Sequence, residues 1–186
     1  ATCRLCFWKN FHASALLCAY FAQYRPEIAR AIPVSPVFAM LSFSYGVNRL
    51  ITRLALTLPN AFVWWDPRNK ERELPLTGYP RFPTHALMQT MRIGDDVYAR
   101  AGSMPMAARS VVAVTNKRDP AVNNRVTAEV VSRWQKQHIP GSHVESFEFA
   151  NLPKNHDIID PQNAEPRLDI VYPKLLDLIA TTPAGA

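Results

Sequence analysis

The chain of 186 residues is 48% hydrophobic, which is enough for one sizeable buried core, and it carries a formal net charge of +6. A positive net charge is typical of proteins that bind nucleic acid. The lysines and arginines are, however, scattered among acidic residues and form no basic stripe, so we expect no nucleic-acid binding. The longest stretch without charge, residues 31–48, is interrupted by Pro33, Pro36 and Gly46, so we expect no membrane span.

All three cysteines lie near the start of the chain. Residues 1–6 lack both a methionine and the basic-then-apolar order of a signal peptide, so we expect an N-terminus that is trimmed or incomplete, with the cytoplasm as the default location. Cys3 and Cys6 form a C-x-x-C pair, which is half of a zinc site or a redox pair. His12 and Cys18 are the only near residues that could complete the zinc site. Half a ligand set defines no site, so we predict ordinary thiols and no metal.

In the first half of the chain, helical periodicity predicts a helix over residues 16–29, with Pro26 near its end. Residues 31–36 are predicted to form a short buried strand that ends in a loop bounded by prolines. Residues 37–105 are rich in aromatic residues and methionine, and their best helical period covers residues 83–101. We interpret 37–105 as an inserted, partly helical layer.

The second half alternates strands and helices. Residues 109–115 form an apolar, β-branched run, typical of a strand that is buried on both faces. After it we predict a turn over residues 116–120 and a helix over residues 123–137 with an apolar face of Val126, Val130, Val131 and Trp134. A strand over residues 143–149 and a loop over residues 151–160 follow. The last predicted element is an amphipathic helix over residues 169–180, which tolerates Pro173 if this residue lies in its first turn. Its apolar face consists of Ile170, Val171, Leu175, Leu176, Leu178 and Ile179.

This alternation indicates an α/β fold, with a parallel sheet covered by helices. In such sheets ligands bind outside the carboxyl ends of the strands. Asp119 and His156 each follow a predicted strand, and they therefore fall at that edge.

An oxygen nucleophile needs a base to remove its proton and a buried acid to orient that base. Taken alone, Asp119 is a turn starter or a helix N-cap, and His156 is a polar surface residue of a loop. Their order and placement together match the acid and the histidine of an α/β-hydrolase, where both follow the nucleophile. We therefore predict that they pair.

Residues 111–123 resemble the strand and acid loop of α/β-hydrolases of the esterase and monoacylglycerol-lipase type, and residues 147–161 resemble their histidine loop. Residues 171–179 are similar to their final helix, and residues 79–101 are similar to a cap segment. Residues 25–36 are similar to the family's run from the helix behind the nucleophile into the next strand.

This resemblance implies a partial α/β-hydrolase fold, with residues 1–36 and 106–186 as an incomplete core and residues 37–105 as a cap. It also implies a carboxylic-ester hydrolase that acts on small apolar acyl esters and needs no cofactor. Asp119 and His156 would be its catalytic acid and base.

The nucleophile is the member of this triad that departs from the family. The G-x-S-x-G elbow needs small residues because its backbone turns tightly, yet no glycine precedes Gly46. Counting back from Pro26 places the nucleophile at His12, and Ser14 lies two residues later. Ser14 is therefore either the nucleophile or a helix-cap serine. Ser35 and Ser42 lack an elbow altogether, and Cys18 would lie inside a helix.

Three hypotheses describe the function, and no motif in the sequence supports the third, a basic module that binds nucleic acid or acidic lipid. The first is a lipase-like esterase with Ser14, Asp119 and His156 as its triad. The second is a catalytically inactive hydrolase-fold relic that acts, if at all, as a scaffold. It is favoured by the altered elbow and by the missing upstream loop that would supply an oxyanion donor. An incomplete sheet would expose its edges, so a homo-oligomer is also expected in this case.

Overall fold

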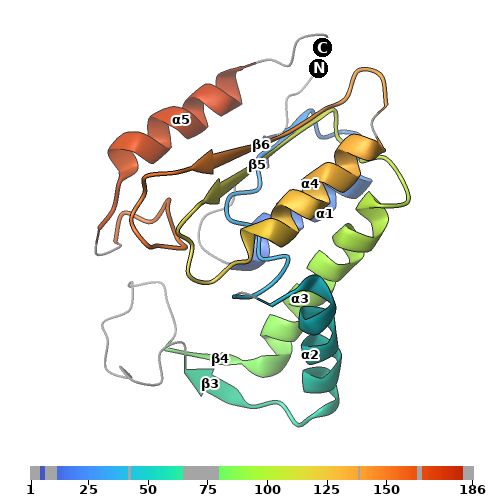
Figure 1. The fold of residues 1–186 in the computed structure, drawn as a ribbon, viewed down its shortest axis with the longest axis vertical. Helices are drawn as coiled ribbons and strands as arrows, with labels where there is room; N and C mark the ends of the chain where they lie inside the picture. The colour runs from blue at the N-terminus through green and yellow to red at the C-terminus, as the bar shows by residue number, and fades with distance from the viewer. Residues whose placement is uncertain are drawn as a thin grey trace.

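The computed structural model describes residues 5–6, 12–41, 43–64, 80–137, 139–162 and 165–181 (Figure 1). Strands and helices alternate along these residues. In chain order they are β1 (Leu5–Cys6), α1 (His12–Tyr24), β2 (Arg30–Ala31), α2 (Tyr45–Thr57), β3 (Phe62–Trp64), β4 (Arg81–Pro83), α3 (Thr84–Ala101), β5 (Ser110–Asn116), α4 (Asn124–Lys136), β6 (His143–Phe149) and α5 (Leu168–Ala180).

The main sheet has the strand order β1-β2-β5-β6, and every pair of neighbours is parallel. All seven residues of β5 are buried, as expected for a strand with a helix layer on each side. Val111 belongs to the core cluster that includes residues of α1, α3 and α4, whereas Val112 and Val114 pack in a second cluster with residues of α5. Figure 1 shows α5 on one side of the sheet and α1 and α4 on the other. The predicted α/β fold is confirmed.

Helix α4 forms as its sequence predicts. The side chain of Asn123 caps its start by accepting a hydrogen bond from the amide of Arg125 at 3.1 Å. The whole predicted apolar face is buried, and it consists of Val126, Val130, Val131 and Trp134. Gly141, with φ of 86°, makes the turn into β6, where the left-handed backbone favours glycine.

The first helix and the strand after it differ from their predicted ranges. Helix α1 starts at His12 rather than at residue 16 and ends at Tyr24 rather than at residue 29, because a residue before proline, here Arg25, disfavours the helical conformation. The strand predicted over residues 31–36 is only Arg30–Ala31. Pro33 has no amide proton to donate, and pairing with β5 resumes as a bridge at Val34.

Helix α5 also corrects two expectations. Pro173 is the sixth residue of the helix, so it lies in the second turn, where it removes one hydrogen bond from the helix. The predicted apolar face is partly wrong as well. Val171, Leu175 and Leu178 are buried, but Leu176 is 64% exposed.

Residues 37–105 contain α2, the antiparallel pair β3–β4 and α3. From its middle to its C-terminal end, α3 packs into the main core through Met91, Val97 and Tyr98. Tyr98 also stacks on Tyr45 of α2, with 3.5 Å between the ring centroids, and its hydroxyl donates to Glu129 of α4 at 2.7 Å. Helix α3 therefore connects α2 to the sheet layer. Residues 65–79 of this predicted layer, Trp65 among them, lie outside the described residues.

Candidate active site at the carboxyl edge of the sheet

The parallel register of β5 and β6 determines where the two predicted site loops begin. Asn116 and Phe149 are the last residues of their strands and are register partners. Because the strands are parallel, both loops leave the sheet at the same edge, and the amide of Lys117 donates to the carbonyl of Phe149 at 3.0 Å. The acid loop and the histidine loop are therefore neighbours from their first residues.

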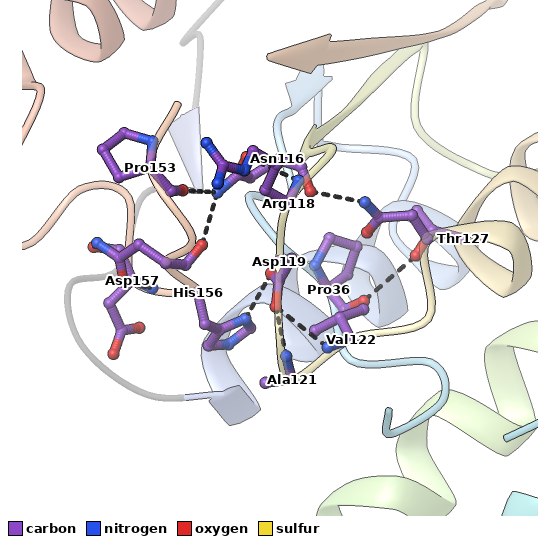
Figure 2. A network of polar contacts seen from close by, with 12 residues as sticks. Pro36, Asn116, Arg118, Asp119, Ala121, Val122, Thr127, Pro153, His156 and Asp157 are labelled. Carbon is purple, nitrogen blue, oxygen red and sulfur yellow. Dashed lines mark hydrogen bonds and ion pairs between the residues drawn. The ribbon is translucent and has the colours of Figure 1, made fainter. Parts of the chain in front are cut away.

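Asp119 is fixed from several sides. Its amide donates to the carbonyl of Asn116 at 3.0 Å. One carboxylate oxygen, Oδ1, accepts from the amides of Ala121 at 2.8 Å and Val122 at 3.1 Å. The side chain is 0% exposed, so these donors replace water around the charge. The second oxygen, Oδ2, points to His156 (Figure 2).

His156 completes a buried pair. Its Nδ1 lies 2.7 Å from Oδ2 of Asp119, and its side chain is 10% exposed. An ionised carboxylate can only accept a hydrogen bond, so the neutral ring carries its proton on Nδ1, and Nε2 is the basic nitrogen. This is the tautomer that a general base requires.

Asn116 joins the two loops, a role that the sequence analysis missed. Its Nδ2 donates to the carbonyls of Pro153 at 2.9 Å and Asn155 at 2.7 Å, and its Oδ1 accepts from the amide of Arg118 at 3.1 Å. The residue is 0% exposed. A polar residue at the end of a strand with a long apolar run was the available signal, although the turn that begins there also explains an asparagine.

The segment after β2 supports the acid loop from another side. The amide of Leu41 donates to the carbonyl of Ala121 at 2.7 Å, and the amide of Asn123 donates to the carbonyl of Ala39 at 2.9 Å. Ser35 in this segment is 5% exposed and has φ of 49°, and its hydroxyl has no hydrogen-bond partner among the described residues. The acid loop is thus held between the histidine loop on one side and the segment after β2 on the other.

Ser14 lies in the first turn of α1 and is half-buried. Helix α1 follows β1, which is paired in parallel with β2, so this turn comes after a strand of the same sheet. The structure thus brings Asp119 and His156 into contact, while the catalytic role of Ser14 stays a prediction. Cys18 is buried in the main core. Ser42 lies outside the described residues.

Among the described residues, no group of three or more histidine, cysteine or acidic side chains could hold a metal ion. Cys3 and the side chains of Cys6 and His12, three of the four residues considered as zinc ligands, lie outside what the structure describes. No described helix combines the length and apolar character that a membrane span requires.

A parallel sheet with helices on both faces, and with a buried Asp–His pair at its carboxyl edge, has the architecture of an α/β-hydrolase. In agreement, the chain is similar to the crystal structure of a soluble variant of monoglyceride lipase from Saccharomyces cerevisiae in complex with a substrate analog, with a TM-score of 0.60. The match covers 89% of this chain and 60% of the lipase chain, at 12% sequence identity. At this identity the similarity demonstrates a shared fold. No protein-family model matches the sequence, and no curated protein matches it significantly.

Proposed function

We propose that the protein is a carboxylic-ester hydrolase of the esterase and lipase type, acting on small apolar acyl esters. The observation that carries this proposal is the 2.7 Å contact between His156 Nδ1 and the fully buried carboxylate of Asp119. A buried anion that orients a histidine at the carboxyl edge of a parallel sheet is the arrangement that base-catalysed acyl transfer needs.

In the proposed reaction, Ser14 is the nucleophile. Its Oγ attacks the ester carbonyl carbon while Nε2 of His156 takes the hydroxyl proton. The same proton then passes to the leaving alkoxide, and an acyl-enzyme forms. In the second half of the reaction, Nε2 of His156 takes a proton from water, whose oxygen attacks the acyl carbon. The proton then passes to Oγ of Ser14, which releases the carboxylic acid and restores the serine. Asp119 stays ionised throughout and stabilises the imidazolium.

Residues 37–105 are proposed as the cap over the acyl group of the substrate. Its aromatic and methionine content favours an apolar substrate over a charged one. Met88 and Met91 are buried in the protein, so they are proposed to support the cap and not to touch the substrate.

The test is labelling by a fluorophosphonate, which reacts with activated serines, followed by peptide mapping. We expect one adduct on Ser14, and we expect His156→Ala to slow labelling by at least about a thousandfold. His143→Ala is the matched control, because His143 also contacts a carboxylate, that of Glu145 at 3.1 Å, but lies half-buried on β6.

A second candidate function is a hydrolase-fold scaffold without hydrolysis. The observation that favours it is the absence of glycine around Ser14, which an ordinary elbow would contain. An unlabelled chain, beside a control hydrolase that labels fully, would reject the esterase proposal and leave the scaffold. An adduct on a different serine would reject the assignment of Ser14 alone.

A further inference from the structure

Arg30, the first residue of β2, is a buried charge without a counter-ion. It is 6% exposed, and no carboxylate among the described residues forms an ion pair with it. Its Nη1 donates to the carbonyl of Thr181 at the C-terminal end of α5. That contact caps the helix but leaves a full positive charge in place, because a guanidinium does not lose its proton in proteins. A buried charge costs free energy unless an opposite charge compensates it, so an anion would be favourable here.

The unused donors of Arg30 lie along one edge of the guanidinium. Nε is enclosed and has no hydrogen-bond partner, and no described group accepts a hydrogen bond from Nη2. These two atoms can donate side by side to the two oxygens of one carboxylate. Arg167 uses the same two atoms in this way on the carboxylate of Asp169, at 3.0 Å and 2.9 Å. In Arg30 the same edge is without an acceptor among the described residues.

A second donor without an acceptor lies beside Arg30. Ser110, the first residue of β5, is the register partner of Arg30 in the parallel sheet, so the two side chains project from the same face. Ile32 and Val112, two residues further along each strand, pack with residues of α5, so this is the face that α5 covers. Ser110 is 0% exposed, and its hydroxyl has no partner in the described part of the chain. Arg30 and Ser110 therefore lack an acceptor in the same place.

The same row of the sheet continues to a more open residue. His143 of β6 is the register partner of Ser110, and its side chain is 42% exposed. Its Nε2 contacts the carboxylate of Glu145 at 3.1 Å, so this carboxylate is engaged on β6 and not with Arg30. The row is enclosed at Arg30 and Ser110 and open to water at His143, which gives a small ligand a route to the two free donors.

We propose that Arg30 and Ser110 form a binding site for a small carboxylate at the amino edge of the sheet. Nε and Nη2 of Arg30 donate to its two oxygens, and the hydroxyl of Ser110 donates to one of them. A monoanion fits better than a phosphate dianion, because a single guanidinium supplies the charge and the C-terminal end of α5 beside it is partly negative. This edge is at the opposite end of the strands from Asp119 and His156, so the proposal does not depend on ester hydrolysis.

The test is an NMR titration of the isotope-labelled full chain with sodium acetate, with sodium chloride at matched ionic strength as the reference. We expect the Nε–H signal of Arg30 and the backbone amide signals of Ser110 and His143 to shift and saturate with acetate, and to stay in place with chloride. Ser110→Ala is expected to raise the Kd for acetate about tenfold, because one hydrogen bond to a charged group is lost. Arg30→Met keeps an apolar stem without the charge, and it is expected to abolish the acetate shifts at residues 110 and 143.

Arg109→Met and Ser146→Ala are the matched controls, because both residues are exposed, and neither change should alter the response to acetate. Shifts that are absent in the wild type, that do not saturate, or that persist unchanged in Arg30→Met overturn the proposal. Saturable shifts with inorganic phosphate but not with acetate also overturn it, and assign the site to a different anion. Circular dichroism checks that each variant folds, and Ser110→Ala, the smaller change, tests the site even if Arg30→Met does not fold.

Discussion

Asn116 is the residue on which the geometry of the site depends, apart from Asp119 and His156. Its buried amide spans from the end of β5 to the carbonyls of Pro153 and Asn155, just before the histidine. The 2.7 Å approach of His156 to Asp119 requires the two loops to keep a fixed separation. Asn116 provides that connection through one side chain.

We therefore expect Asn116→Ala to destabilise the protein by about 1–3 kcal/mol, because two partly buried carbonyls and the amide of Arg118 lose their hydrogen-bond partner. If the proposed function holds, fluorophosphonate labelling slows as well. Urea unfolding measures the first effect and labelling kinetics the second. Asn151→Ala, in the exposed part of the histidine loop, is the control and should change neither.

Tyr24 provides a prediction on pH. Its hydroxyl donates to the carboxylate of Asp96, and burial together with that carboxylate raises the pKa of Tyr24 from 10.0 to about 12. The folded state favours the neutral phenol, so its contribution to stability is complete below pH 10.0 and is lost as the pH rises through about 12.

Tyr24→Phe removes this dependence. We expect the wild type to exceed the variant in unfolding free energy below pH 10.0, and we expect the difference to shrink between pH 10.0 and about 12. Urea unfolding of both chains across this range measures the difference. A gap that stays constant with pH would contradict the assigned pKa.

The catalytic roles of Asp119 and His156 stay a prediction. At the residue scale, their contact could be predicted from the sequence, because each follows a predicted strand and their chain order matches a triad. The role of Asn116 could not be predicted. An asparagine that starts a turn has the same local signature as one that joins two loops, and only the position of the second loop distinguishes them.

At the scale of elements, α5 shows how closely packing decides which side chains are buried. Leu175 is 2% exposed and packs in the cluster that includes Val112 and Val114, while its neighbour Leu176 is 64% exposed. Both residues are leucines, so they have the same hydrophobicity and the same helix propensity. Their difference comes only from the rotation of the helix against the sheet.

This pair makes a matched test. Leu175→Ala is expected to lower the unfolding free energy by about 2–5 kcal/mol, because it leaves a cavity under the helix. Leu176→Ala is expected to change it by no more than about 0.5 kcal/mol. Urea unfolding compares them, and similar costs would mean that α5 is rotated differently.

The bounds of β5, β6, α3 and α4 could be predicted to within one residue, because their periodicity is strong and turn residues flank them. In the rest of residues 37–105, before α3, the sequence predicts no particular helix and leaves open where α2 lies. Even if the bounds of α2 had been predicted, Leu50 and Leu54 would have been expected to be buried. Which face of α2 is buried depends on its packing against α3, which the sequence of α2 does not contain.

At the scale of the whole molecule, one buried link crosses the helix layer. The indole Nε1 of Trp134 on α4 donates to Oε1 of Gln23 on α1 at 2.6 Å, and Nε2 of Gln23 donates to the carbonyl of Pro105 at 3.1 Å. Both side chains are 1% exposed. The link joins the start of the chain to its second half across 111 residues.

We expect Trp134→Phe to cost about 1–3 kcal/mol beyond its loss of volume, because Oε1 of Gln23 stays buried without a donor. Adding Gln23→Leu should recover part of that cost, so the double-mutant cycle should give a coupling of about 0.5–3 kcal/mol. Urea unfolding of the four chains measures it. Additive costs would show that the two side chains do not interact.

The class of the fold and most of its strands and helices follow from the sequence, because hydrophobic period and turn chemistry are properties of neighbouring residues. The sequence also predicts Asp119 and His156 at one edge of the sheet, because parallel strands share that edge. The 2.7 Å contact between them, the bridge made by Asn116 and the outward leucines of α2 could be seen only in the folded chain. Each of these depends on surfaces that meet only after distant parts of the chain have packed, and no local pattern encodes how they meet.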